Sequence, residues 1–155
     1  KTAQLLMQAA LPDNLTPDIY PIIGLDNPNQ TTLIKRLIAD GAFLQPKPGK
    51  LSVQPLIRDI ARSEFKTFNI ITHNQLQITL GDYYLSQNHY ALAVYHYLQG
   101  DDITKAINHA EQAALSLYTL RFRDDLLRLA LLFDTDDAVP ILRLRAALVA
   151  LDFAK

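Results

Sequence analysis

Residues 27–65 decide the fold, and they read NPNQTTLIKRLIADGAFLQPKPGKLSVQPLIRDIARSEF. Asn27, Pro28 and Gln30 form a helix start signal, because asparagine caps a first turn, proline suits the first helical position, and the glutamine completes a capping box. Apolar residues within 33–38 then fall on one helical face, and Gly41 favours the end of the helix. The stretch therefore predicts an amphipathic helix that begins at Pro28.

A small hairpin is predicted directly after that helix. Apolar runs at 42–45 and 51–53 flank the sequence PKPGK at 46–50, in which proline and glycine are typical turn residues. Pro55 then opens another helix that runs through residue 65. The glycines at 41 and 49 have seven residues between them and Leu51 follows the lysine, whereas a phosphate-binding loop needs four residues and then Ser or Thr. We therefore expect no nucleotide-phosphate cradle in this chain.

Two further helices are expected before this stretch. Residues 2–10 read as a helix, and Thr16 with Pro17 resembles a cap followed by proline at the first position of a second short helix. Three helices, a hairpin and a closing helix make a winged-helix-like unit, which we place at residues 1–66. The hairpin is its wing.

The rest of the chain, residues 67–155, is expected to be a TPR-like helical repeat region. After residue 65 Pro140 is the only proline, and apolar periodicity predicts long helices at 72–86, 89–99, 103–120, 124–133 and 139–153. The tetratricopeptide spacing is matched by Leu80, Gly81, Tyr84, Ala93 and Tyr97. Lys105 stands where that repeat usually has proline. The fold class is therefore predicted as mainly all-α, a winged-helix-like unit with a β-hairpin followed by antiparallel helix pairs of a TPR-like α-solenoid.

Composition argues against several classes of function. The formal net charge of -1 gives no general reason to bind a polyanion, and the helix before the wing and the wing itself offer only the basic residues Lys35, Arg36, Lys47 and Lys50. Direct nucleic-acid binding is therefore not expected. Cysteine is absent, and no apolar run reaches the roughly 18 residues of a membrane helix. We expect a cytoplasmic chain without a membrane partner.

No catalytic or metal site is predicted. No pair among His73, His89, His96 and His109 has the i, i+4 spacing of a helical metal site. The acidic pairs at 101–102, 124–125 and 136–137 each precede a predicted helix, where the helix dipole favours carboxylates. We therefore expect a chain that is not an enzyme and holds no cofactor of its own.

Interaction surfaces are predicted instead. Tyr83, Tyr90, Tyr95 and Phe122 are candidates for a partner or effector surface, because aromatic side chains offer a large apolar area and tyrosine adds a polar tip. Residues 139–153 are too apolar to end a helical array, whose last repeat normally turns a polar side outward. Further helical repeats of the same protein or self-association should cover that helix.

Several stretches resemble the signal-transduction ATPases with numerous domains, particularly the bacterial transcriptional regulators of the maltose-activator, LuxR type. The N-terminal likeness rests on LIKRL at 33–37, AFL at 42–44 and LSVQPLIRDIA at 51–61. The C-terminal likeness rests on GDYY at 81–84, the stretches 88–96 and 101–114, and LRLRAAL at 142–148. Taken together, the resemblance covers most of the chain.

The resemblance implies that an upstream nucleotide-binding domain of the same protein binds ATP or ADP, and that this chain transmits effector binding to it. Family members commonly carry a histidine after the wing that reaches the nucleotide phosphates. Gln54 occupies that position here, and it can donate a hydrogen bond without supplying a cationic switch. Two alternatives remain open: a TPR-like adaptor unrelated to an ATPase, and a winged-helix DNA-binding protein.

Overall fold

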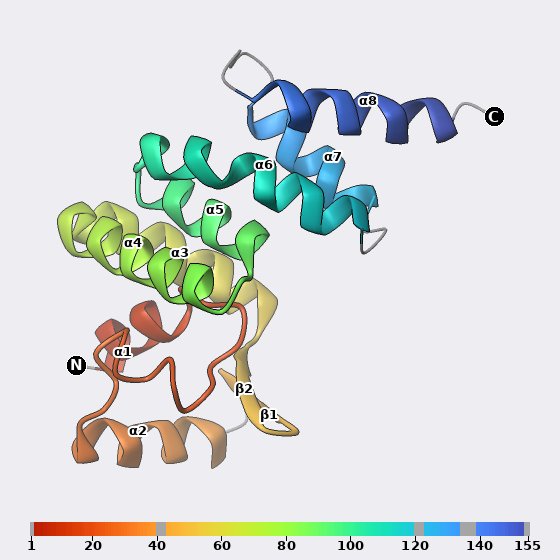
Figure 1. The fold of residues 1–155 in the computed structure, drawn as a ribbon. Helices are drawn as coiled ribbons and strands as arrows, with labels where there is room; N and C mark the ends of the chain where they lie inside the picture. Colours follow the sequence, from red (N-terminus) through yellow and green to blue (C-terminus); the bar gives the residue numbers. More distant parts are fainter. Residues whose placement is uncertain (1, 40–42, 120–122, 134–138, 154–155) are drawn as a thin grey trace. The chain divides into compact units, whose positions relative to one another are not determined.

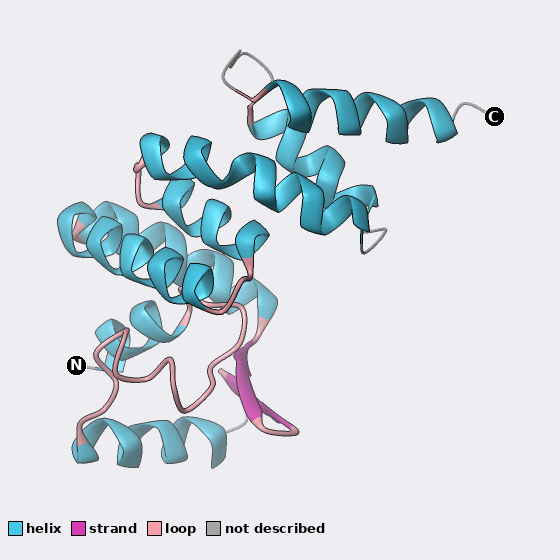
Figure 2. Cartoon of the chain, in the orientation of Figure 1, coloured by secondary structure: helices cyan, strands magenta, loops and turns pink. Residues whose placement is uncertain are grey.

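The structure of the chain is a computed structural model that describes residues 2–39, 43–119, 123–133 and 139–153. Over these residues the chain is mainly helical with one small antiparallel sheet, which confirms the predicted mainly-α class (Figures 1 and 2). No helix in these ranges is both long enough and apolar enough to cross a membrane. The elements are α1 (Thr2–Ala9), α2 (Pro28–Ala39), β1 (Leu44–Lys47), β2 (Lys50–Val53), α3 (Pro55–Phe68), α4 (Ile70–Ser86), α5 (Tyr90–Gln99), α6 (Ile103–Thr119), α7 (Arg123–Leu132) and α8 (Pro140–Phe153).

The chain forms two compact units, Lys1–Leu80 and Gly81–Lys155. The division falls inside α4, on the C-terminal side of the boundary that the sequence placed after residue 66. The domain bounds 1–66 and 67–155 therefore stay a prediction.

The start of α2 has the capping geometry that its sequence predicts. The side chain of Gln30 accepts a hydrogen bond from the backbone N–H of Asn27 at 3.1 Å, and Asn27 Oδ1 accepts one from the N–H of Asn29 at 2.9 Å. These reciprocal bonds satisfy N–H groups that have no partner within the helix. The predicted stop at Gly41 lies outside the described residues, and α2 ends at Ala39.

The hairpin is confirmed, but its strands reach further into the PKPGK sequence than predicted. Lys47 pairs with Lys50 and Pro46 with Leu51, so only Pro48 and Gly49 form the turn. Gly49 has φ +71°, as the third residue of a type II turn requires, and proline suits the position before it. The predicted strand residue Ala42 lies outside the described residues.

Pro46 is accepted within β1 because the opposite residue turns its polar backbone groups away from it. Leu51 donates its N–H to the carbonyl of Leu15 at 2.8 Å and accepts the N–H of Leu15 at 2.7 Å. Such outward groups are typical of the residues that do not bond each other in an antiparallel pair. Proline therefore removes no hydrogen bond from the hairpin, and a single residue pair joins Leu15 to its outer edge.

The second short helix predicted after Thr16 is wrong. Residues 17–24 form consecutive turns, and the N–H of Ile19 bonds the carbonyl of Thr16 while that of Leu25 bonds the carbonyl of Tyr20. Pro21 has no N–H to donate and its ring obstructs a preceding helical turn, so the hydrogen-bond pattern cannot become regular. Gly24 then takes φ +71° and redirects the chain toward α2.

The core of the unit Lys1–Leu80 is made by α1, α2, α3, the hairpin and the turns between α1 and α2. Helices α1 and α3 pack against each other, and α2 contacts β1. Burial of apolar side chains from all of these elements supplies the main favourable term in folding. The buried apolar side chains include Leu5, Ala9, Leu11, Leu15, Ile19, Ile23, Leu25, Ile34, Leu37, Leu44, Val53, Ala61 and Phe65.

The unit Gly81–Lys155 is helical. Helix α6 packs against α5, α7 and α8, and α7 also packs against α8. Small residues on one face of α6 are fully buried at Ala106, Ala110 and Ala113, which lets neighbouring helices approach closely. Ile103, the first residue of the helix, is 46% exposed.

Candidate functional site

Helices α4 and α5 come into close contact at Gly81 of α4 and Tyr97 of α5. A Cβ atom on Gly81 would lie 2.5 Å from Tyr97 Cε1 and 2.6 Å from Cδ1, which is well inside van der Waals contact. Tyr97 is fully buried, so its ring has no open space to move into. Glycine at residue 81 therefore permits these two helices to pack at this distance.

A polar network surrounds the hydroxyl of Tyr97. The hydroxyl donates to Asp82 Oδ1 at 2.8 Å, and Lys105 Nζ donates to the same oxygen at 2.7 Å. Lys105 also places its ammonium group 5.3 Å from the centre of the Tyr97 ring, a cation–π distance. Burial, followed by the hydrogen bond and the negative charge of Asp82, raises the pKa of Tyr97 above its ordinary value of 10.0.

Lys105 therefore has a specific role at the position where the tetratricopeptide consensus usually has proline. It ties α6 to the end of α4 through Asp82, while Asp102 Oδ1 accepts the backbone N–H of Lys105 at 3.0 Å and caps α6. This cap confirms the predicted role for Asp102, whereas Asp101 takes φ +63° and donates its N–H to the carbonyl of Leu98. The side chains of the pairs at 124–125 and 136–137 are not among those that the structure describes.

Two of the four residues predicted as a partner surface belong to one aromatic cluster. The ring of Tyr84 stacks on His96 with centroids 5.1 Å apart and an interplanar angle of 10°. Tyr83 meets Tyr84 edge-on at 5.2 Å, and Tyr95 meets His96 edge-on at 5.2 Å. Tyr84 and His96 are buried, whereas Tyr83 and Tyr95 are half-buried. The cluster thus has a closed centre and two accessible tyrosines.

Tyr90, the third predicted surface residue, lies apart from this cluster. Tyr90 is half-buried at the start of α5, and its hydroxyl donates to Asn88 Oδ1 at 3.2 Å. Among the described residues no ring contact joins Tyr90 to the cluster. Phe122 lies outside the described residues. The role of all four as a partner or effector surface stays a prediction.

Gln54 is half-buried and precedes α3 as its N-cap residue. Its N–H donates to the carbonyl of Phe43 at 3.1 Å, and its carbonyl accepts the N–H of Arg58 at 2.8 Å. The side chain makes no capping bond to α3, because Pro55 at the first helical position leaves fewer N–H groups to satisfy. Leu56 and Ile60, one turn apart on the same helix, are 71% and 53% exposed.

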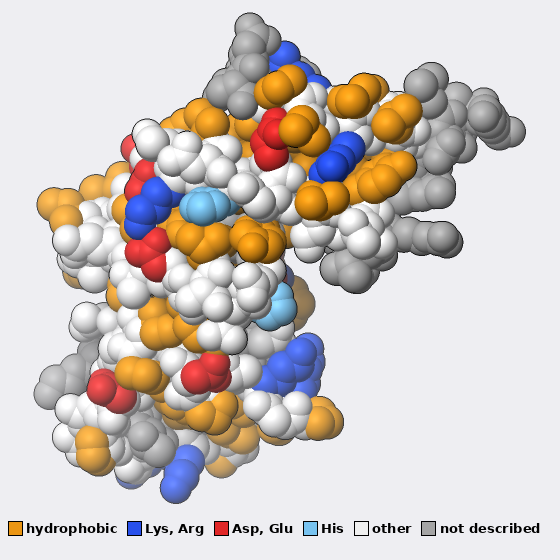
Figure 3. Space-filling view, viewed as in Figure 1, with side chains coloured by type: hydrophobic (Ala, Val, Ile, Leu, Met, Phe, Trp, Pro, Cys, Tyr) orange, Lys and Arg blue, Asp and Glu red, His pale blue; other side chains and the backbone are white. Residues whose placement is uncertain are grey.

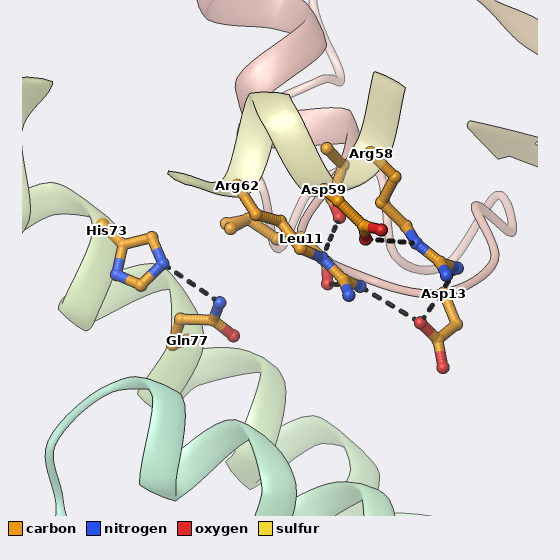
Figure 4. Close-up of polar contacts among 8 residues, drawn as sticks. Leu11, Asp13, Arg58, Asp59, Arg62, His73 and Gln77 are labelled. Carbon is orange, nitrogen blue, oxygen red and sulfur yellow. Dashed lines mark hydrogen bonds and ion pairs between the residues drawn. The ribbon is translucent and has the colours of Figure 1, made fainter. Parts of the chain in front are cut away.

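An arginine cluster further along α3 holds the segment that follows α1. Arg62 donates from Nε to the carbonyl of Ala10 and from Nη2 to the carbonyl of Leu11, both at 2.6 Å. Arg62 and Arg58 also pair with Asp13 Oδ1 at 3.1 and 3.2 Å (Figure 4). Because the guanidinium of Arg62 satisfies two backbone carbonyls, we assign this cluster to joining α1 and α3.

His73 is also explained by packing. It is 2% exposed, its ring meets Phe65 edge-on at 5.7 Å, and Asn74 Oδ1 lies 3.0 Å from its Nδ1. The amide nitrogen of Gln77 approaches its Nε2 at 3.3 Å (Figure 4). An amide nitrogen can only donate, so the tautomer that fits this contact accepts at Nε2 and donates from Nδ1 to Asn74 Oδ1.

The side chains described above contact other groups of their own unit. The tyrosines and arginines are placed against aromatic rings, carbonyl groups and carboxylates of the same unit. Within the described ranges, no three His, Asp or Glu side chains come together as a set that could hold a metal ion. Comparison with protein-family models, with curated proteins and with solved structures gave no match to this chain.

Proposed function

We propose that this chain is a non-catalytic regulatory and protein-interaction segment of a larger ATP-dependent transcriptional or signalling regulator. In this proposal the N-terminal part is a winged-helix-like domain and the C-terminal part is a TPR-like array. The order α1, α2, hairpin, α3 supports the first part, as does the pairing of Leu15 with Leu51 at the outer edge of the hairpin. The close contact of Gly81 with Tyr97 supports the second.

The observation that carries the proposal is the exposed apolar ridge on α3. Leu56 and Ile60 are 71% and 53% exposed and share one face of the helix, because residues four apart are neighbours on a helix surface. Exposed apolar side chains that lie together mark an interaction surface more often than one exposed leucine does. The ridge starts directly after Gln54, the residue that the family resemblance brings near the nucleotide. It therefore fits a surface that packs on an upstream nucleotide-binding domain.

The mechanism is a shift between two forms of the larger protein. In the inactive form the ridge packs on the nucleotide-binding domain and retains ADP. Effector binding to the helical repeats favours an open form, by an amount equal to the difference in its affinity for the two forms. Gln54 carries no charge at any pH and therefore adds no ionic contact to the nucleotide. In this proposal the packing of Leu56 and Ile60 sets how strongly the winged-helix-like domain holds to the nucleotide-binding domain.

Substituting Leu56→Asp or Ile60→Asp in the full-length protein should weaken ADP binding by about tenfold, which is within the range typical of coupling between sites. A carboxylate on the ridge must lose its water to pack, so the closed form becomes less favourable. ADP affinity is measured by calorimetry. Both side chains are largely exposed, so the fold of the chain should be kept.

The matched control is Lys66→Gln, which changes the charge of α3 by the same amount at an exposed position away from the ridge. It should leave ADP affinity unchanged. If Leu56→Asp and Ile60→Asp both behave like Lys66→Gln, the ridge does not close on the nucleotide-binding domain and the proposal is wrong.

A further inference from the structure

A second apolar surface lies on α6 and α8, within the unit Gly81–Lys155. We call it the α6–α8 face and define it by Leu115, Tyr118, Ile141, Leu144 and Leu148, which are 51%, 47%, 44%, 61% and 46% exposed. Figure 3 shows hydrophobic side chains gathered over these two helices, with charged side chains among them. The opposite side of α8 packs inside the unit, because Leu142, Ala146 and Val149 are buried. Helix α8 is thus apolar on both sides.

The exposed residues of α6 and α8 belong to one continuous face. At one end Glu111 Oε1 accepts a hydrogen bond from the N–H of Ile141 at 2.9 Å. Four residues later on α8 and seven residues later on α6, the guanidinium carbon of Arg145 lies 5.9 Å from the centre of the Tyr118 ring. Both contacts advance in the chain direction of both helices, so α6 and α8 run parallel and their exposed side chains form neighbouring rows.

Arg145 lies in this face with part of its hydrogen-bonding capacity unused. Its Nη1 atom is buried and has no hydrogen-bond partner among the described residues. The guanidinium lies near the Tyr118 ring, which attracts a cation but accepts no strong hydrogen bond. Nη1 is closed off by atoms of the chain itself, so a partner can reach only the rest of this half-buried guanidinium. A carboxylate is the best partner for that part, because the bond is charge-assisted. The face therefore presents apolar rows and a half-buried cation.

We infer that the α6–α8 face binds an amphipathic helix of a partner protein, one whose apolar stripe is interrupted by an Asp or Glu that pairs with Arg145. A helix laid on a groove contacts it through side chains at i, i+3, i+4 and i+7, which matches two parallel apolar rows. The inference rests on the proposed function, since it names the chemistry of a partner for the interaction segment.

A second copy of this chain is a poorer occupant of the face. A two-fold antiparallel pairing of the row Ile141, Leu144 and Leu148 would place Arg145 of each copy close to the symmetry axis, since Arg145 lies between those residues in sequence. Like charges brought together in an interface disfavour it. An acidic helix has the opposite effect, because its carboxylate carries the charge opposite to that of Arg145.

The test uses the full chain and synthetic amphipathic helices of about four turns, with leucine at i, i+3, i+4 and i+7 and one central position that is Glu, Gln or Lys. Binding is measured by fluorescence anisotropy. The Glu peptide should bind about tenfold more tightly than the Gln peptide, the size expected for a charge-assisted hydrogen bond, and the Lys peptide should bind least.

Two variants locate the effect on the chain. Arg145→Gln should remove the preference for Glu over Gln, while Leu144→Asp should weaken all peptides. Leu144 is 61% exposed, so the fold should tolerate this change. A Glu preference that persists in Arg145→Gln overturns the pairing, and absence of binding by every peptide overturns the site.

Sedimentation of the chain alone distinguishes a second copy as the occupant. The inference predicts a monomer, and a dimer that Leu144→Asp dissociates would show that self-association covers the face instead. Nucleotide affinity is measured on α3 variants and peptide binding on α8 variants. Failure of one experiment can therefore be told apart from failure of the other.

Discussion

Replacing Gly81 with valine is expected to lower the free energy of unfolding by about 3 kcal/mol, at the upper end of what overpacking a core costs. Even the first added carbon would lie 2.5 Å from Tyr97 Cε1, and Tyr97 is fully buried. The ring cannot move without breaking its hydrogen bond to Asp82. Equilibrium unfolding in urea, followed by circular dichroism, measures the change.

The matched control for this substitution is Thr79→Val, which places the same side chain at an exposed position of the same helix. Surface changes of this kind stay within about 0.5 kcal/mol. The double variant Gly81→Val, Tyr97→Leu should lose less stability than the sum of the two single variants, because it removes the ring that the new carbon meets. Equal stability of Gly81→Val and Thr79→Val would contradict the close packing described here.

Above pH 10 the free energy of unfolding is expected to fall as pH rises, and Tyr97 should contribute up to about 1.4 kcal/mol per pH unit. The pKa of Tyr97 is raised in the folded chain from its ordinary value of 10.0, first by burial and then by Asp82. Between the two pKa values the unfolded chain has released this proton and the folded chain has kept it. The stabilisation is therefore complete below the unfolded pKa and is lost as pH rises above it.

Urea midpoints at pH values from about 9 to about 11.5 measure this slope, a range that brackets the tyrosine titration. Other groups also titrate there, so the informative comparison is between variants. Tyr97→Phe should reduce the slope, whereas Tyr118→Phe, which removes a hydroxyl from a 47% exposed ring, should keep it. The same slope in Tyr97→Phe and the unsubstituted chain would show that this phenol does not carry the effect.

Much of the fold follows from local signals in the sequence. The capping box at Asn27 and Gln30 and the turn at Gly49 are confirmed, because each depends on residues only a few positions apart. The second helix was predicted from the start signal at Thr16 alone. Pro21 lies inside the predicted helix and has no N–H to donate. This missing hydrogen bond argues against a regular helix and outweighs the start signal.

The strand lengths could not be predicted because they depend on a distant residue. Pro46 reads as a turn residue, and it is accepted in β1 only because Leu51 bonds Leu15 on its other side. No local pattern in the sequence links Leu15 to the hairpin. The sequence therefore predicts that a hairpin forms, but it does not predict how long the two strands are.

The sequence predicts the residue types of the candidate site better than it predicts how those residues are arranged. The sequence predicts Tyr83 and Tyr95 as surface residues, but the stacked pair of Tyr84 and His96 that connects them requires α4 and α5 to be placed together. Lys105 looked like the loss of a consensus proline, and only the structure reveals its ion pair with Asp82.

Arg62 was missed for a similar reason. Its guanidinium bonds the carbonyls of Ala10 and Leu11, some fifty residues earlier in the chain. Backbone carbonyls carry no sequence signature, so their side-chain partners cannot be read from residue types. Long-range contacts of this kind are what the sequence alone leaves undetermined.

The central claim is that this chain regulates a nucleotide-binding domain without binding nucleotide by itself. The most direct test is calorimetric titration of ATP and ADP into the isolated chain and into the full-length protein that contains it. We predict that only the full-length protein binds, and that Gln54→Ala leaves its affinity unchanged. Tight binding of ATP or ADP by the isolated chain would contradict the claim.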